Sequence, residues 1–211
     1  MNLQDMRENY TKGELLESEI SQNPIQQFAQ WMEFAVANKV KEPNAMQLAT
    51  VSKLGQPTIR TVLLKNFDKN GFTFFTNYLS RKANEIQDNN HVALQFVWLD
   101  LERQIRIEGT TSKLTNLQSK EYFKSRPRES QLAAWASPQS DKIEKISLKK
   151  RLDRYKNEFE HYRLIPKPDF WGGYVVKPHL IEFWQGRESR LHDRIQYELN
   201  NGIWLISRLA P

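Results

Sequence analysis

The alternation of short β-prone segments with turn-forming residues is the feature that most limits the fold of this chain. Residues 46–52 and 58–67 look like strands, and the sequence LGQP that separates them is typical of a hairpin turn. A second turn, with the sequence DKNG, precedes the aromatic segment 72–76. Further strands are predicted at residues 91–98, 104–114, 174–176, 180–184 and 203–208. This succession predicts an antiparallel sheet closed into a barrel or a sandwich.

Helices are predicted at the edges of that sheet. Asn23 before Pro24 marks the start of the first of them. The predicted helices cover residues 24–39, 81–87, 115–124 and 141–160. The last helix is highly charged, and its predicted inward-facing residues are Ile143, Ile146, Leu152, Tyr155 and Phe159. Because no segment looks like a linker, we expect one mainly β domain, residues 1–211, with peripheral helices.

Several chemistries are disfavoured by what the sequence lacks. It has no cysteine, which excludes disulfides, thiolate catalysis and thiolate metal sites. The histidines lie far apart, which disfavours a zinc site. The sequence contains no G-x-S-x-G elbow, which disfavours a hydrolase with a catalytic triad. No glycine-rich phosphate loop is present, so any phosphate must be held by side chains. Neither a membrane-spanning run of roughly 20 apolar residues nor a targeting signal is evident, so we expect a cytoplasmic protein.

The net charge of +6 favours an anionic partner. Nucleic acid is one candidate, but the longest basic run is only KKR at residues 149–151. Small phosphorylated ligands explain scattered arginines at least as well. Charge alone therefore leaves both classes of partner open.

Two groups of basic residues lie at the ends of predicted elements. Arg60 and Lys65 bracket the sequence TVLL, and a separation of five positions on one strand places them on opposite faces. Ser80, Arg81 and Lys82 begin a predicted helix, where backbone N–H groups and two cations favour an anion. Both groups are also explained as solvated surface charges.

Tyr122, Arg126 and Ser130 recur every four residues across a predicted helix end. A hydroxyl, a guanidinium and a second hydroxyl form a suitable cradle for a phosphate. The alternative is an ordinary helix terminus in which Ser130 caps the next element.

Another candidate segment follows the strand that ends near Trp184. Arg190, His192 and Arg194 lie within five residues of one another, a concentration of functional groups that is typical of a binding loop. The alternative is a plain loop in which Asp193 neutralises its neighbours.

Over essentially its whole length, the chain resembles the pyridoxamine 5′-phosphate oxidase family, also called the pyridoxine 5′-phosphate oxidase family. The resemblance rests on the order and combination of short segments, none of which is conclusive alone. They are RTVLLK at 60–65, FT at 75–76, SRK at 80–82, ERQ at 102–104, YFKSRPRES at 122–130, QS at 139–140, FWGG at 170–173, EFWQ at 182–185, RLHDR at 190–194 and RLAP at 208–211. Arg7 and Tyr10 also match an R-x-x-Y segment of the family.

The resemblance implies a split β-barrel that forms a homodimer and binds flavin mononucleotide (FMN) in two equivalent clefts at the subunit interface. The residues it assigns to FMN are Arg60, Thr61, Val62, Leu63, Leu64, Lys65, Phe75, Thr76, Arg81, Lys82, Gln104, Gln139, Ser140, Trp184 and Arg194. The residues it assigns to the substrate are Arg7, Tyr10, Lys65, Tyr122, Arg126, Ser130, Arg190, Leu191 and His192. Arg190 and His192 are the implied catalytic residues, residues 1–20 are expected to be a mobile segment that closes over the substrate, and no metal is implied.

The implied reaction is the oxidation of pyridoxamine 5′-phosphate and pyridoxine 5′-phosphate to pyridoxal 5′-phosphate. A hydride passes to the flavin, which yields the aldehyde directly from pyridoxine 5′-phosphate and an imine from pyridoxamine 5′-phosphate. Water hydrolyses the imine to the aldehyde and ammonia, and O2 reoxidises the flavin and becomes H2O2. Two alternatives stay open: a related split-barrel flavin oxidase that acts on another ring, and a non-catalytic protein that binds flavin or pyridoxal phosphate. No nucleic-acid or membrane partner is expected, because the basic residues then serve small phosphates.

Overall fold

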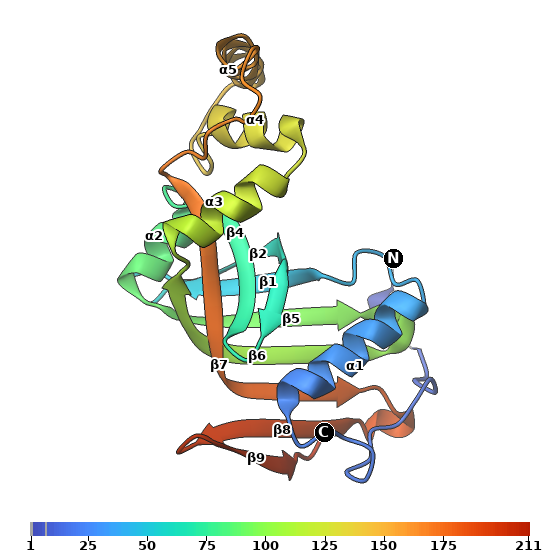
Figure 1. The fold of residues 1–211 in the computed structure, drawn as a ribbon. Helices are drawn as coiled ribbons and strands as arrows, with labels where there is room; N and C mark the ends of the chain where they lie inside the picture. Colours follow the sequence, from blue (N-terminus) through green and yellow to red (C-terminus); the bar gives the residue numbers. More distant parts are fainter. Residues whose placement is uncertain (1, 7) are drawn as a thin grey trace.

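The structure is a computed structural model that describes residues 2–6 and 8–211, and it is built around an antiparallel sheet that curls into a half-barrel (Figure 1). The strands of the described residues are β1 (Ala45–Val51), β2 (Pro57–Leu63), β3 (Asn66–Asp68), β4 (Gly71–Asn77), β5 (His91–Trp98), β6 (Arg103–Lys113), β7 (Trp171–Gln185), β8 (Asp193–Asn200) and β9 (Ile203–Arg208). Their order is β2-β1-β5-β6-β7-β4-β3, and β8 and β9 continue from β7. The predicted mainly β class with an antiparallel sheet is confirmed.

Helices cover the core and one end of this sheet (Figure 1). They are α1 (Pro24–Ala37), α2 (Arg81–Asp88), α3 (Asn116–Ser125), α4 (Arg128–Ala136) and α5 (Lys145–Glu158), with the short 3₁₀ helices η1 (Leu3–Asp5), η2 (Leu99–Leu101) and η3 (Glu188–Arg190). α1 begins as predicted, because Asn23 Oδ1 accepts a hydrogen bond from the Ile25 N–H at 2.9 Å. Phe28 of α1 is fully buried and packs edge-on against Phe72 and Phe96, so α1 closes the barrel core.

The long strand β7 corrects the strand boundaries expected from the sequence. The predicted strands 174–176 and 180–184 are parts of one continuous strand. Pro178 is accommodated within it because the register with β6 shifts between Glu108 and Gly109, opposite the proline. The first half of β7 pairs with β4 and the second half with β8, a strand that the sequence does not predict. One strand thus connects two parts of the barrel.

The predicted strand 58–67 is divided into β2 and β3. After β2 the chain leaves its partner β1 and crosses to β4. The Lys65 N–H donates to the Thr73 carbonyl at 2.8 Å, between the two strands. Because the change of partner lies between Arg60 and Lys65, the expectation that they occupy opposite faces of one strand is wrong.

α3, α4 and α5 form a helical lobe at the top of the molecule in Figure 1. The sequence does not predict α4, because Pro127 looks like a stop signal. In the structure Pro127 occupies the N-cap position of α4, where its missing N–H costs nothing, and only Arg126 and Pro127 separate α3 from α4. Ser130 lies inside α4 and does not cap it.

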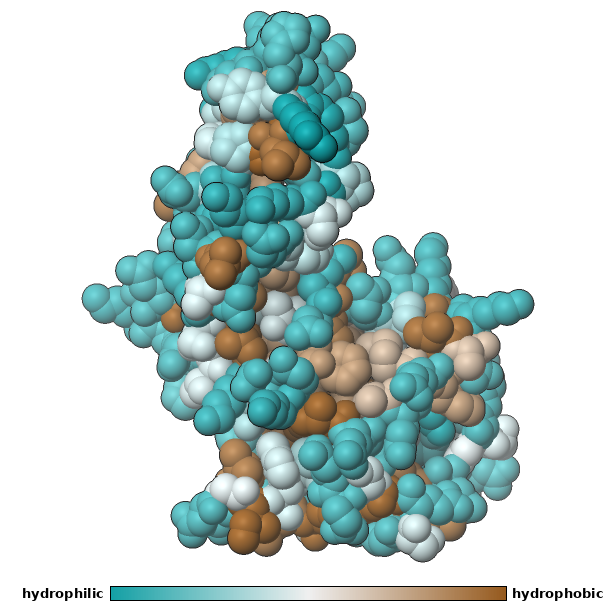
Figure 2. Space-filling model, in the orientation of Figure 1, coloured by the Kyte–Doolittle hydropathy of each residue, from teal (hydrophilic) through white to brown (hydrophobic). Residues whose placement is uncertain are grey.

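The charged helix α5 begins later and ends earlier than predicted. Phe159 is buried after its last turn, and Leu152 and Tyr155 are partly buried, as expected. Ile143 and Ile146, predicted to face inward, are 41% and 55% exposed. They have no core to enter because α5 packs mainly on α4 at the outer end of the lobe, which is mostly hydrophilic in Figure 2. Within the described part of the chain, every helix is too short or too polar to span a bilayer.

Candidate functional site

A cleft of about 620 Å³ lies where the barrel meets the helical lobe. It is lined by Thr61, Val62, Leu63, Lys65, Phe75, Thr76, Asn77, Lys82, Tyr122, Ser125, Arg126, Pro127, Ser130, Ala133, Ala134, Ser137, Gln139 and Trp171. Most of the polar residues in this set are ones that the sequence assigns to flavin or to substrate. The fold therefore gathers residues from β2, β4, α2, α3 and α4 around one space.

An aromatic wall forms one side of the cleft. The Phe75 ring stacks on Tyr122 with ring centroids 3.9 Å apart, and on Trp171 with ring centroids 5.3 Å apart. The Arg126 guanidinium lies 4.7 Å from the centroid of the Trp171 ring. The sequence assigns no role to Trp171, although the family segment FWGG contains it. A flat wall beside a cation suits a planar, anionic ligand.

Arg126 is a half-buried cation, and the described residues do not use all of its hydrogen-bonding capacity. Its Nη1 atom is buried, and no described residue accepts a hydrogen bond from it. Burial lowers the pKa of Arg126 and raises the pKa of Tyr122 beside it. Leaving a buried donor unsatisfied costs roughly 1–3 kcal/mol, and more when the group is charged. An anion in the cleft removes that cost.

Lys82 brings a second cation to the cleft from the first turn of α2. Its Nζ donates to Gln139 Oε1 at 2.6 Å and to Thr76 Oγ1 at 3.1 Å. Burial, together with the nearby charge of Arg60, lowers the pKa of Lys82 to about 8. Ser80 stands at the N-cap position of α2, but its side chain makes no capping hydrogen bond within the described residues. Its hydroxyl accepts a hydrogen bond from Lys82 Nζ at 3.1 Å instead.

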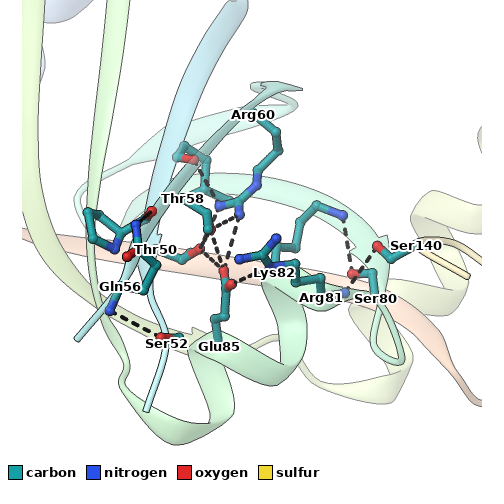
Figure 3. Close-up of polar contacts among 12 residues, drawn as sticks. Thr50, Ser52, Gln56, Thr58, Arg60, Ser80, Arg81, Lys82, Glu85 and Ser140 are labelled. Atoms are coloured by element: carbon teal, nitrogen blue, oxygen red, sulfur yellow. Dashed lines mark hydrogen bonds and ion pairs between the residues drawn. The ribbon is translucent and has the colours of Figure 1, made fainter. Parts of the chain in front are cut away.

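Arg60 and Arg81 lie beside Lys82 and share one carboxylate (Figure 3). Glu85 Oε2 accepts a hydrogen bond from Arg60 Nη2 at 3.1 Å, and Glu85 Oε1 accepts one from Arg81 Nε at 2.8 Å. The Arg81 backbone N–H donates to Ser140 Oγ at 3.1 Å. These flavin-assigned residues form one cationic group around Glu85, to which the sequence assigns no role. The available signal was its position four residues after Arg81 on a helix.

The other predicted residues gather at the far end of β7. The Trp184 ring centroid lies 4.7 Å from that of His192 and 5.8 Å from that of Tyr10. His192 Nδ1 accepts a hydrogen bond from a backbone N–H at 3.1 Å. Arg190 has a left-handed φ of 62° in the turn before β8. Tyr10 and Leu191 line a second hollow, of about 650 Å³.

Several flavin-assigned residues do not reach the cleft in this chain. Arg194 Nε and Nη2 donate to the two carboxylate oxygens of Glu182 at 2.9 and 3.0 Å, and Glu182 is only 3% exposed. Gln104 Oε1 accepts a hydrogen bond from a neighbouring glutamine at 2.7 Å. Leu64 is buried in the barrel core. Arg7 lies outside the residues that the structure describes.

The predicted residues therefore form two separate groups in one chain. The cleft contains Trp171, the first residue of β7, whereas Trp184 and the RLHDR segment lie at the other end of that strand. A strand advances roughly 3.3 Å per residue, so most of the length of β7 separates the two groups.

Two family models together match most of the chain. Residues 32–154 match the model described as pyridoxamine 5′-phosphate oxidase, and residues 171–211 match the pyridoxine 5′-phosphate oxidase C-terminal dimerisation region. The chain belongs to the pyridoxamine 5′-phosphate oxidase family. Within this family match, the dimerisation region covers β7, β8 and β9, and with them the second group of predicted residues.

Relatives in the pyridoxamine 5′-phosphate oxidase family match over the full length. The pyridoxine/pyridoxamine 5′-phosphate oxidases of Crocosphaera subtropica and Teredinibacter turnerae are 52% and 53% identical to this chain, and each alignment covers 100% of both proteins.

Solved structures share the fold. PhzG from Burkholderia lata, in complex with tetrahydrophenazine-1-carboxylic acid, has a TM-score of 0.88 at 26% identity, covering 93% of this chain and 98% of its own. A pyridoxamine 5′-phosphate oxidase-related, FMN-binding protein from Nostoc punctiforme has a TM-score of 0.72 at 16% identity, covering 90% and 99%, and supports the fold alone. The family and the split-barrel fold expected from the sequence are confirmed.

Proposed function

We propose that this chain oxidises pyridoxamine 5′-phosphate and pyridoxine 5′-phosphate to pyridoxal 5′-phosphate, with FMN as cofactor and O2 as the acceptor that becomes H2O2. Full-length relatives at about half identity carry the name of this activity. The observation that carries the proposal is the buried Arg126 Nη1 atom, for which no described residue is an acceptor, in a cleft of about 620 Å³. A cleft of this size lies within the usual range for cofactor and substrate sites.

FMN fits the cationic group at the α2 side of the cleft. Its phosphate carries close to two negative charges, and Arg60, Arg81 and Lys82 supply the opposite charge. Thr61, Val62, Leu63, Lys65 and Thr76 line the cleft, and we assign them to the ring system. When bound, FMN supplies the redox chemistry by accepting a hydride from the substrate and passing the electrons to O2.

Arg126, Tyr122, Ser130 and Lys65 form the proposed site for the substrate phosphate. Arg126 supplies a charge-assisted hydrogen bond, and the two hydroxyl groups add further donors. With both phosphates anchored, two flat rings are held face to face, so binding energy orients the reacting carbon. This set favours a phosphorylated substrate over the unphosphorylated ring acid with which PhzG was crystallised.

We infer a homodimer in which each site uses residues of both chains. The matched dimerisation region carries Arg190 and His192, which lie far from the cleft of their own chain. β2 is an edge strand whose Ile59 and Leu63 are 64% and 39% exposed, and a second copy would cover this apolar edge. In this dimer the RLHDR segment of one copy faces the cleft of the other, and the segment that contains Tyr10 follows it.

Arg190 and His192 are the proposed catalytic residues. Because His192 Nδ1 accepts a backbone hydrogen bond, the neutral ring carries its proton on Nε2. That N–H is then available to hold the amine or hydroxyl group of the substrate. The Arg190 guanidinium adds a fixed positive charge beside the ring, which steadies the charge that changes as the hydride leaves.

The test is aerobic incubation of the purified, FMN-loaded protein with pyridoxine 5′-phosphate, following aldehyde formation and O2 uptake. We expect pyridoxal 5′-phosphate and H2O2 to appear together. No aldehyde from a fully loaded sample would overturn the proposal in favour of a non-catalytic binding protein. Oxidation of an unphosphorylated ring, with none of pyridoxine 5′-phosphate, would indicate the related oxidase instead.

A further inference from the structure

Glu85 is a buried carboxylate at the centre of the cationic group (Figure 3). It lies on α2, is 5% exposed, and receives hydrogen bonds from two other elements besides its own helix. Its Oε2 atom accepts from Thr50 Oγ1 of β1 at 2.5 Å and from Thr58 Oγ1 of β2 at 2.6 Å, in addition to Arg60. Its Oε1 atom accepts from Arg81.

Each described side chain that forms a hydrogen bond with the Glu85 carboxylate donates to it. A carboxylate is the one common side chain that only accepts, through two oxygens with about four lone-pair sites. Burial acts to raise the pKa of Glu85, but the hydrogen bonds from Thr50, Thr58 and Arg81 and the charge of Arg60 lower it to about 2. Glu85 is therefore ionised throughout the physiological range, as a bridge between cations requires.

The two arginines differ in how much of their hydrogen-bonding capacity is used. Both Nη atoms of Arg60 are engaged by the protein, with the Leu48 carbonyl at 3.0 Å, with Thr50 Oγ1 at 2.6 Å, and with Thr58 and Glu85. Among the described residues, the side chain of Arg81 is held through Nε alone, and it is 63% exposed. No described residue accepts from the Nη atoms of Arg81, so they are available to an anion.

The net charge of this cationic group also matches that of the phosphate of a mononucleotide. Arg60, Arg81 and Lys82 are cations and Glu85 is an anion, which leaves a balance of two positive charges. The phosphate of a mononucleotide carries about −1.5 to −2 at neutral pH. Without the carboxylate, three cations would repel one another, and the exposed Arg81 would be free to turn toward solvent.

Resting on the proposed function, we propose that Glu85 is a positioning residue for the FMN phosphate, holding Arg60 in place and orienting the free edge of Arg81 toward the phosphate. It does not touch the ligand itself but acts through the two arginines. This role predicts that replacing Glu85 weakens the binding of the FMN phosphate and leaves the binding of the flavin ring unchanged.

The test compares FMN with riboflavin, which lacks the phosphate, by fluorescence titration of the apoprotein. In Glu85→Gln, the amide nitrogen cannot accept a hydrogen bond, so one arginine loses its partner. We expect the Kd for FMN to rise about 10- to 100-fold, while the Kd for riboflavin changes less than about 2-fold. Asp88→Asn, an exposed acid on the same helix, is the matched control and should leave both affinities unchanged.

A double variant separates positioning from general damage. Arg81→Ala should weaken FMN binding strongly in the natural background and much less in the Glu85→Gln background. Both changes disrupt the same contact of Arg81 with the phosphate, so their effects should not add. Equal loss of FMN and riboflavin binding, additive effects, or an unchanged or tighter Kd for FMN would each overturn the proposal.

Two further comparisons keep the test decisive. If Glu85→Gln does not fold, Glu85→Asp keeps the charge but is too short to reach both arginines, and the same selective loss of FMN affinity is expected. If Glu85→Asp bound FMN as tightly as the unaltered protein does, the positioning role would also be overturned. If the unaltered protein does not itself prefer FMN to riboflavin, the proposed function fails, and that result is distinct from a failure of Glu85.

Discussion

At the scale of single residues, Arg126 and Lys82 place two different cations at the two sides of one cleft. Arg126 has a buried Nη1 atom that finds no acceptor in the described part of the chain, whereas Lys82 donates to oxygen atoms of Thr76, Ser80 and Gln139. The first cation therefore requires a ligand for its hydrogen bonds. Lys82 already has hydrogen-bond partners, and its lowered pKa controls whether it carries a charge.

Replacing Arg126 should mainly weaken substrate binding. In Arg126→Ala, we expect KM for pyridoxine 5′-phosphate to rise about 10- to 100-fold with a smaller change in kcat, since a hydrogen bond to a charged group contributes roughly 1.5–3 kcal/mol. Lys124→Ala is the control, because Lys124 lies in the last turn of α3, just before Arg126, and pairs with exposed Glu121 at 2.8 Å. Steady-state kinetics with both variants give the answer, and an unchanged KM in Arg126→Ala would contradict the phosphate assignment.

FMN affinity should depend on the protonation of Lys82. Its pKa is lowered from 10.5 to about 8, so the ammonium is present below pH 8 and is lost as the pH rises through that value. Because the phosphate binds the protonated form, the Kd for FMN should rise above pH 8, by at most about tenfold per pH unit. Titrations between pH 7 and 10 measure this directly. In Lys82→Met the rise should disappear, and a rise that persists there would assign the titration to another group.

At the scale of elements, the start of β7 shapes the aromatic wall through a close approach at Gly173. A Cβ atom at this position would lie 2.6 Å from Leu114 Cδ1 and 2.8 Å from the Phe75 ring. Phe75 has little freedom to move, since it stacks on both Tyr122 and Trp171. The absence of a side chain at Gly173 is therefore what allows the ring to stand against the cleft.

Gly173→Ala should destabilise the fold by overpacking. We expect a loss of roughly 1–3 kcal/mol in the free energy of unfolding, seen as a lower Tm in thermal unfolding. Gly13→Ala is the comparison, because the nearest contact of its new Cβ, Gln185 Oε1, would lie at 3.2 Å and so is less severe. Equal Tm values for the two variants would contradict this prediction, because they would show that Phe75 can move aside without a loss in the free energy of unfolding.

At the scale of the whole molecule, the separation of the two groups of predicted residues along β7 supports the proposal that each site is shared between two chains of a dimer. The cleft and the RLHDR segment belong to opposite ends of that strand, and the segment lies in the matched dimerisation region. A two-fold axis relates two equivalent copies, so each copy can give its second group to the other.

Subunit mixing tests this arrangement. Arg126→Ala and His192→Ala homodimers should each have low activity. If each site uses Arg126 of one chain and His192 of the other, mixed dimers contain one site with both residues intact. After random exchange, we expect about a quarter of the natural activity to return. No recovery after exchange, verified with differently tagged subunits, would mean that each site lies within one chain.

The sequence alone determined the features that depend on near neighbours. β5 and β9 have the predicted bounds, 91–98 and 203–208, because strand alternation and turn residues act over a few positions. The Asn23 cap is likewise a local contact. The ordered motifs also indicated the family, since they record which residues are present and in which order.

Only the tertiary structure decided which distant groups meet. Continuity of β7 through Pro178 depends on a register shift in β6, and the break before Lys65 depends on a change of strand partner. In the site, the sequence named Arg60 and Arg81 but not the carboxylate between them. Burial, charge pairing and stacking depend on contacts between residues far apart in the chain, and no local pattern records them.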